Sequence, residues 1–260
     1  MKKTLIIGNW KMYVDKPEDA KALAAALKRK VAAFSPVEVV VAPPFPLIAT
    51  VAQALALPSK VKTAGGIRLG AQSVSAFTDE KHTGDVSAAM LKRFGVSYVI
   101  VGHSERRAAG ESDEMIAAQI VQAQAAGLTA VLCIGETEQD ATGTHFSALE
   151  AQLRSALSEH TAVSKLVVAY EPVWAIGKTA AEAMQPAQLR ETSIYIRKIL
   201  VEILGRTGAL RVPVLYGGSV EGANAAGLLS EGDIAGFLVG HASVDPGSFS
   251  DIILACRTLK

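Results

Sequence analysis

The chain has 260 residues, of which 50% are hydrophobic and 20% are charged, and its formal net charge at pH 7 is +1. This length and composition indicate a globular protein with ample material for a hydrophobic core. With acidic and basic residues so nearly balanced, nucleic acid and membrane surfaces are excluded as expected partners.

Targeting and cysteine signals point to a soluble cytoplasmic protein. Two lysines and a short apolar run open the sequence, but the run stops at Gly8, too early for a signal peptide. No stretch has the length and apolar character of a membrane span. Cys133 and Cys256 show neither CxxC pairing nor metal-ligand spacing, so we expect buried free thiols, no metal site and a reducing compartment.

Short apolar segments alternate with longer amphipathic ones along the whole chain. The predicted strands are residues 4–7, 37–42, 67–72, 97–101, 129–134, 166–171, 212–216 and 235–239. They are solidly apolar, as expected of parallel strands that are covered on both faces. The predicted helices are residues 17–33, 86–94, 113–126, 148–159, 186–204, 223–229 and 248–255. No linker divides the chain, so residues 1–260 are expected to form one domain.

Eight βα units in this length predict an α/β fold of the closed (β/α)₈ type, with eight parallel strands surrounded by helices. An open, doubly wound sheet is the alternative that the pattern leaves open. The barrel is favoured because the chemically distinctive residues follow predicted strands directly. In a (β/α)₈ barrel, these C-terminal strand ends converge on one face.

Three of these strand ends carry polar groups suited to proton transfer. Glu171 ends the sixth strand and precedes Pro172, which interrupts regular structure, and then a run of apolar residues. An apolar loop of this kind suggests a flap above a shielded base, although an ordinary structural Glu fits too. His103 follows the fourth strand, where a helical turn beginning at Ser104 opposes protonation of the ring, although a hydrogen-bonded structural histidine fits too. Lys11 follows the first strand and would meet an anion, unless it is merely solvated.

The seventh and eighth strands are followed by glycine-containing loops. These are residues 216–220 (YGGSV) and 239–242 (VGHA). Glycine lets backbone N–H groups approach a phosphate closely, and (β/α)₈ barrels often bind phosphate with this pair of loops. The sequence thus offers a base (Glu171), a polarising group (His103), a cation (Lys11) and a phosphate site. This set suits proton abstraction beside a carbonyl in a small phosphorylated substrate, with no cofactor.

Five segments at these strand ends resemble the triosephosphate isomerase family. They are residues 8–12 (GNWKM), 101–107 (VGHSERR), 132–136 (LCIGE), 169–177 (AYEPVWAIG) and 216–220 (YGGSV). The resemblance implies a TIM barrel and a cofactor-independent aldose–ketose isomerase. The implied reaction interconverts dihydroxyacetone phosphate and D-glyceraldehyde 3-phosphate in glycolysis and gluconeogenesis. It also implies a homodimer, to which residues 73–84 would contribute an interface loop.

The resemblance assigns a role to each matched residue. Glu171 would be the base, and His103 a neutral electrophile that polarises the carbonyl. Lys11 and Asn9 would hold the substrate and stabilise the enediolate, and Glu105 would position Lys11. The phosphate would be bound by the backbone of residues at the ends of strands six to eight, which are Gly177, Ser219, Gly240 and His241.

Three positions depart from the usual family pattern. Residues 178–180 (KTA) lack the second glycine of the flap, and the segment that reaches Pro186 is about two residues longer than usual. His241 replaces a glycine, so its β-carbon is expected to disfavour a positive φ or to crowd the phosphate. Tyr13 replaces an asparagine, which suggests a change at a subunit contact.

Two other functions remain open at this point. A different phosphate-binding barrel enzyme, such as an aldolase, is disfavoured because no lysine stands at a buried mid-strand position. A non-catalytic phosphate-binding paralogue is opposed by the presence of Glu171, His103 and Lys11.

Overall fold

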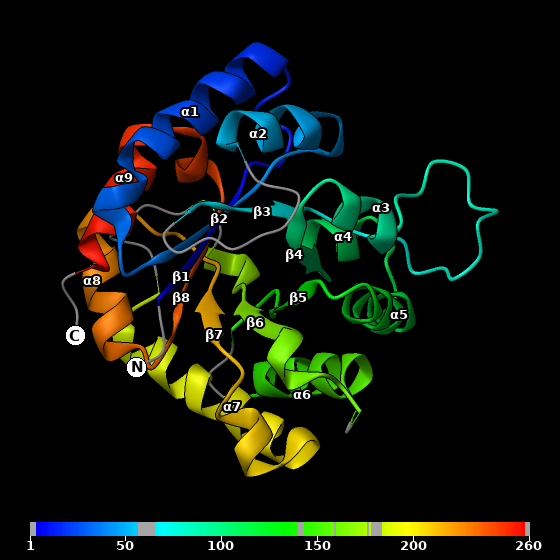
Figure 1. Ribbon diagram of the computed structural model, residues 1–260. Coiled ribbons are helices and arrows are strands. Elements are labelled where there is room, and N and C mark those ends of the chain that lie inside the picture. The colour runs from blue at the N-terminus through cyan, green and yellow to red at the C-terminus, as the bar shows by residue number, and fades with distance from the viewer. Residues whose placement is uncertain are drawn as a thin grey trace.

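The eight strands close into a barrel in the order of the chain (Figure 1). The computed structural model describes residues 4–56, 66–139, 143–158, 160–175, 177 and 184–257. The strands are β1 (Leu5–Asn9), β2 (Glu38–Ala42), β3 (Arg68–Ala71), β4 (Val96–Val101), β5 (Thr129–Ile134), β6 (Leu166–Tyr170), β7 (Val214–Tyr216) and β8 (Gly236–Val239). All neighbours are parallel, and β1 pairs with β8. This closure confirms the predicted (β/α)₈ barrel and excludes the open sheet.

Helices surround the strands on the outside of the barrel (Figure 1). They are α1 (Pro17–Phe34), α2 (Ile48–Leu55), α3 (Ala88–Arg93), α4 (Ser104–Ala108), α5 (Asp113–Ala125), α6 (His145–Ala156), α7 (Pro186–Ala209), α8 (Gly222–Glu231) and α9 (Pro246–Ala255). Short 3₁₀ turns are found at Phe45–Leu47, Val163–Lys165, Val173–Ala175 and His241–Val244. Proline occupies the first turn of α1, α7 and α9, where its missing N–H has no helical partner to lose.

The core has two layers, which explains why most strand residues are apolar. Alternate strand residues point to opposite faces. One set fills the barrel interior, and the other packs between strands and helices. In β6, for example, Val167 and Ala169 face inward, whereas Val168 and Tyr170 face the helices. With both faces buried, most residues of both sets are apolar.

The same alternation delivers two of the predicted site residues to the barrel mouth. Asn9 follows the inward residues Leu5 and Ile7 at a spacing of two, and Glu171 follows Ala169 in the same way. Both side chains are buried, with relative exposures of 5% for Asn9 and 3% for Glu171. The pleat of the strands therefore positions these polar groups before any loop is considered.

Two local expectations were incomplete. The first strand runs to Asn9 rather than to residue 7, because Gly8 and Asn9 continue the ladder with Val41 and Ala42. The prediction contained no helix between the second and third strands, where α2 forms directly after the 3₁₀ turn Phe45–Leu47. Prolines before this helix resemble a helix-breaking signal, but proline is accepted at a helix start.

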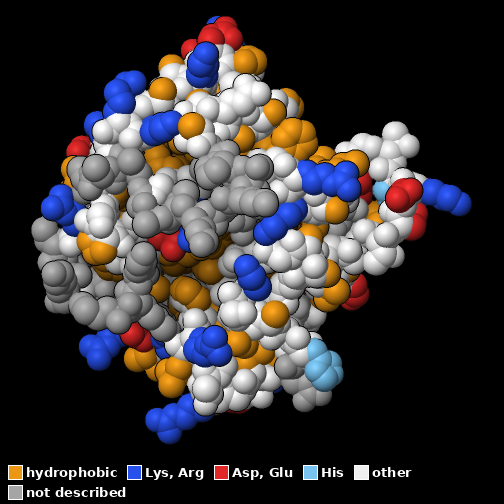
Figure 2. Space-filling model, in the orientation of Figure 1, with side chains coloured by type: hydrophobic (Ala, Val, Ile, Leu, Met, Phe, Trp, Pro, Cys, Tyr) orange, Lys and Arg blue, Asp and Glu red, His pale blue; other side chains and the backbone are white. Residues whose placement is uncertain are grey.

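The described part of the chain also bears on the other sequence expectations. Both cysteines are free and buried, as predicted. None of the helices described is long and apolar enough to cross a membrane. Among the described residues, no group of His, Cys, Asp and Glu is arranged to hold a metal ion. On the face drawn in Figure 2, basic side chains lie singly or in small groups among uncharged surface.

Candidate active site

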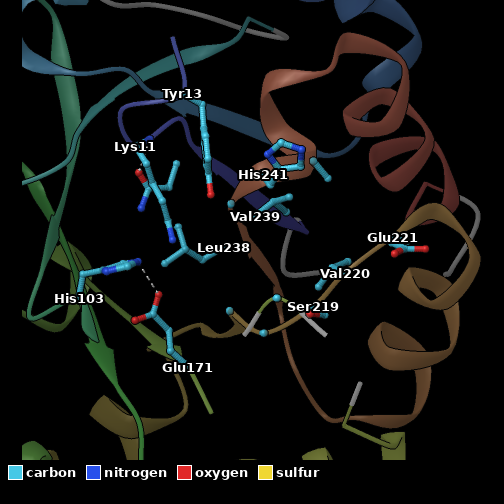
Figure 3. Close-up of a pocket in the computed structure, with 16 residues that line it drawn as sticks. Lys11, Tyr13, His103, Glu171, Ser219, Val220, Glu221, Leu238, Val239 and His241 are labelled. Atoms are coloured by element: carbon cyan, nitrogen blue, oxygen red, sulfur yellow. Dashed lines mark hydrogen bonds and ion pairs between the residues drawn. The ribbon is translucent and has the colours of Figure 1, made fainter. Parts of the chain in front are cut away.

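A cavity of about 280 Å³ opens at the C-terminal ends of the strands (Figure 3). Its size suits a small metabolite rather than a drug-sized ligand. The structure brings eight of the predicted site residues into its wall, from five different strand ends: Asn9, Lys11, His103, Glu171, Gly177, Ser219, Gly240 and His241. Convergence of the strand ends, which the sequence only predicted, is therefore observed.

Glu171 lies at the bottom of this cavity and is almost fully buried. Its Oε1 atom is 3.2 Å from Nε2 of His103, and its Oε2 atom accepts the backbone N–H of Ser104 at 3.3 Å. Burial raises the pKa of this carboxyl group above its ordinary value, while the neighbouring His103, the Ser104 N–H and the Lys11 ammonium act in the opposite direction. A raised pKa makes the carboxylate a stronger base than one in water.

Two glycines on neighbouring strands provide the space for Glu171. A β-carbon at Gly135, after β5, would lie 1.8 Å from the Glu171 carbonyl oxygen. A β-carbon at Gly217, after β7, would lie 2.7 Å from Cγ of Glu171. The sequence suggested phosphate binding for residues 216–220 and gave Gly135 no role of its own. Gly135 leaves room for the backbone of Glu171 and Gly217 leaves room for its side chain, a clearance that local sequence does not reveal.

His103 is held in one tautomer by the helix that it precedes. It is the N-cap of α4, and its Nδ1 atom accepts the backbone N–H of Glu105 at 3.2 Å. A ring nitrogen that accepts a hydrogen bond carries no proton, so the proton of the neutral ring lies on Nε2. Nε2 faces Glu171, as the dashed line in Figure 3 marks. The ring therefore presents an N–H donor to the cavity.

Lys11 occupies an unusual backbone conformation at the cavity wall. Its φ is 46°, in the left-handed region that costs a non-glycine residue about 1–2 kcal/mol. Three hydrogen bonds hold the turn: the Lys11 N–H donates to Oδ1 of Asn9, the Lys11 carbonyl accepts from Gln72, and Tyr13 N–H donates to the Trp10 carbonyl. Strain retained in this way is typical of functional residues.

The ammonium group of Lys11 is held in place by the carboxylate of Glu105. Nζ of Lys11 lies 2.6 Å from Oε1 of Glu105, the geometry expected from the resemblance. The Lys11 side chain is 19% exposed and that of Glu105 is 61% exposed. An ion pair at such a site adds little stability. Its consequence is geometric, because it keeps the cation at the rim of a buried site.

The opposite wall of the cavity is formed by the loops after β7 and β8. Ser219 donates its hydroxyl to the carbonyl of Ala175 at 3.0 Å, so the β7 loop is attached to the segment after β6. Gly240 precedes the 3₁₀ turn that begins at His241, and a β-carbon at Gly240 would be only 3.7 Å from Cε of Lys11. Lys11 and the glycine-containing loops after β7 and β8 thus line the same small cavity.

Tyr13 and His241, two residues that depart from the family pattern, contact each other. Their rings meet edge to face, with centroids 5.0 Å apart and an interplanar angle of 77°. His241 does not adopt a positive φ. The strain expected there is therefore absent. Tyr13 lines the cavity, a position that the sequence did not predict. The suggested subunit contact of Tyr13 stays a prediction.

The apolar segment after Glu171 is docked on a buried acid. Trp174 donates its indole N–H to Oε1 of Glu136 at 2.7 Å, and the Val173 N–H donates to the Glu136 carbonyl. Tyr170 binds the same carboxylate at 2.8 Å. Glu136 lies two residues beyond the end of β5, near a strand end like the predicted site residues, yet the sequence gave it no role of its own. The departures at residues 178–180 lie outside the described residues.

Comparison with known proteins gives one consistent match. A family model described as "Triosephosphate isomerase" matches residues 4–256. Proteins named triosephosphate isomerase are similar over nearly the whole chain. The relative from Idiomarina loihiensis is 40% identical over 261 residues, covering 99% of this chain and 98% of its own. The relative from Symbiobacterium thermophilum is 41% identical over 264 residues, covering 100% and 99%. That from Carboxydothermus hydrogenoformans is 42% identical over 259 residues, covering 97% and 98%.

Proposed function

The chain belongs to the triosephosphate isomerase family, and we propose that its cavity interconverts dihydroxyacetone phosphate and D-glyceraldehyde 3-phosphate through an enediolate. The observation that carries the proposal is the buried contact of 3.2 Å between Glu171 and the protonated Nε2 of His103. A base and a hydrogen-bond donor directed at one point match a reaction that removes a proton from carbon while polarising the adjacent carbonyl.

Glu171 handles the proton on carbon, and His103 handles the protons on oxygen. The Glu171 carboxylate takes a proton from the carbon beside the carbonyl, and the C–H electrons form the C=C bond of the enediol. The carbonyl electrons move to oxygen, where the N–H of His103 stabilises and protonates the developing charge. Return of the carboxyl proton to the neighbouring carbon, with proton transfer between the two oxygens, completes the isomerisation. Substrate replaces the direct contact between His103 and Glu171 during this sequence.

Charge in the cavity favours the enediolate oxygen, which is negative, over the uncharged carbonyl group of the substrate. Lys11, whose ammonium group is paired with Glu105, lines the cavity and would stabilise the negative charge that develops on the substrate oxygen. Asn9 uses its Oδ1 atom to accept the Lys11 N–H, which leaves its NH₂ group as the donor to a ligand oxygen. Donors placed in advance within a water-poor site stabilise such charge far better than water does.

The phosphate is assigned to the opposite wall. Gly177, Ser219, Gly240 and His241 line the cavity, and their backbone N–H groups would bind the phosphate. Glycine permits close approach of the backbone to an anion, which is why these positions suit phosphate. Anchoring the phosphate there would hold the reacting carbons between Glu171 and His103. The hydrogen bond from Trp174 to Glu136 fixes the turn Val173–Ala175 that follows Glu171.

The test is an isomerisation assay with the unmodified chain and no added metal or cofactor. We expect rapid conversion of D-glyceraldehyde 3-phosphate to dihydroxyacetone phosphate. In D₂O, deuterium should enter the product at the carbon that receives the proton, because the proton that a carboxyl group carries between the two carbons can exchange with solvent before it is returned. A chain that binds glycerol 3-phosphate without turnover would instead be a non-catalytic phosphate-binding paralogue.

We further propose that the chain acts in the cytoplasm, in glycolysis and gluconeogenesis, as a homodimer. The support for a dimer is the segment between β3 and α3, which projects from the barrel in Figure 1. Phe77 in this segment is 44% exposed and stacks on His82 at a centroid distance of 3.6 Å. Ser75 is bonded to Asp85 and Val86 across its base, so the projection has a defined shape.

Sedimentation equilibrium tests the dimer. We expect twice the 27.2 kDa mass of the chain and a shift toward monomer in Phe77→Asp, because burying an unpaired carboxylate in an interface is costly. Val121→Asp, at a 62% exposed position on α5, is the matched control and should remain dimeric. A monomeric wild type, or a Phe77→Asp variant that dimerises unchanged, would contradict the proposal.

A further inference from the structure

The rings of Tyr13 and His241 pack edge to face, with centroids 5.0 Å apart. The two residues come from opposite ends of the chain and meet because β1 and β8 are neighbours. Both line the same cavity as Glu171 and Gly240. Figure 3 shows the Tyr13 ring reaching into the cavity between Lys11 and His241. The geometry lies within the preferred range for aromatic pairs.

The two partners differ in how firmly the chain holds them. Tyr13 belongs to the turn that carries Lys11, and its N–H is bonded to the carbonyl of fully buried Trp10. Gln72 binds the same turn through the Lys11 carbonyl. His241 is exposed at the first position of a 3₁₀ turn, and its ring contact in the structure is with Tyr13. These hydrogen bonds fix the backbone of Tyr13, which is 53% exposed, and the Tyr13 ring is the described ring contact that orders the His241 imidazole.

The placement of His241 makes this restraint consequential. Its backbone N–H follows Gly240 at the end proposed to bind phosphate, in a cavity of about 280 Å³. An imidazole free to rotate over this opening would obstruct the phosphate, and it would lose conformational freedom when a ligand bound. Packed on Tyr13, the ring is already ordered at the rim.

We propose that Tyr13 is a positioning residue that holds the His241 imidazole at the rim and so keeps the backbone of Gly240 and His241 open to phosphate. This inference rests on the proposed function, because the phosphate-bearing substrate is its ligand. Tyr13 acts through its ring. The described contacts give its hydroxyl no hydrogen-bond partner, so removal of the hydroxyl alone leaves the restraint intact. Tyr13 and His241 therefore act as a coupled pair, in which a change at one residue alters the effect of the other.

The experiment measures binding of glycerol 3-phosphate by calorimetry, together with KM and kcat. Tyr13→Ala should weaken binding and raise KM roughly 2- to 10-fold, the range that corresponds to one aromatic pair, with kcat little changed. Tyr13→Phe should restore binding to the wild-type level. The double variant Tyr13→Ala/His241→Gly should regain most of the lost affinity, because no imidazole remains to be restrained. Leu210→Ala, exposed at the opposite end of the barrel, controls for general effects.

These variants distinguish positioning of His241 by Tyr13 from direct contact of either residue with the ligand. If Tyr13→Ala binds as tightly as wild type, the pair positions nothing and the proposal is wrong. If the double variant binds no better than Tyr13→Ala, the tyrosine contacts ligand directly, which also overturns it. A large loss of affinity in His241→Gly alone would show that the imidazole itself binds phosphate. Because calorimetry needs no turnover, an inactive wild type would remove the proposed function while leaving this binding test valid.

Discussion

Glu171→Asp should lower kcat by several hundred-fold or more, as an order of magnitude, in the conversion of D-glyceraldehyde 3-phosphate. Proton transfer by a correctly placed group contributes on the order of 10² to 10⁴ in rate. The aspartate carboxylate would be withdrawn by one methylene from a position that His103 and the Ser104 N–H now define. A displacement of about 1 Å is sufficient for a loss of this size.

Glu171→Gln separates the chemistry from the stability of the fold. Because burial raises the pKa of Glu171, the folded state binds this proton more tightly than the unfolded state does. Protonated Glu171 therefore contributes to the free energy of unfolding at low pH. That contribution is lost as the pH rises from the ordinary pKa of glutamate in the unfolded chain toward the higher pKa of Glu171 in the folded chain. At neutral pH the neutral glutamine should leave thermal stability equal or higher while activity is lost. Retention of activity in Glu171→Gln would exclude Glu171 as the base.

Lys11→Met should lower kcat/KM by at least 10² to 10³, as an order of magnitude. Removing a single donor to a developing oxyanion has effects of this size, and Lys11 supplies a full positive charge at the cavity wall. Methionine keeps the length and apolar stem of the side chain, so packing changes little. Steady-state kinetics across a range of substrate concentrations would measure the loss in both kcat and KM.

Glu105→Gln is the matched control for Lys11→Met. It keeps the cation and removes only the carboxylate 2.6 Å away, so a smaller loss is expected than for Lys11→Met. The unfolding free energy of Lys11→Met should remain within about 1 kcal/mol of wild type, because an ion pair with a partner as exposed as Glu105 stabilises little. An active, destabilised Lys11→Met would show a structural role instead.

Much of the fold and part of the site follow from local patterns in the sequence. Apolar runs of strand length predict strands that are buried on both faces, and the structure confirms the barrel that they form. The same alternation places Asn9 and Glu171 on the inner face, since each lies two residues beyond an inward-facing neighbour. Such features are encoded by spacing along the chain, which is why they can be read without coordinates.

The contacts that shape the site come from distant segments. Gly135 and Gly217 make room for Glu171, although each belongs to a different strand loop. Glu136 anchors Trp174 across two neighbouring loops. No periodicity in the sequence reports these clearances and hydrogen bonds, because they exist only after strands have paired side by side.

Tyr13 and His241 illustrate this limit most clearly. The sequence marked each as a departure from the family pattern, and separately associated one with a subunit contact and the other with a crowded phosphate site. The structure places them in edge-to-face contact in one cavity wall. The two ends of the chain meet there because pairing of β1 with β8 closes the barrel. Local sequence thus decided which residues are buried or catalytic in type, and closure of the barrel decided which of them touch.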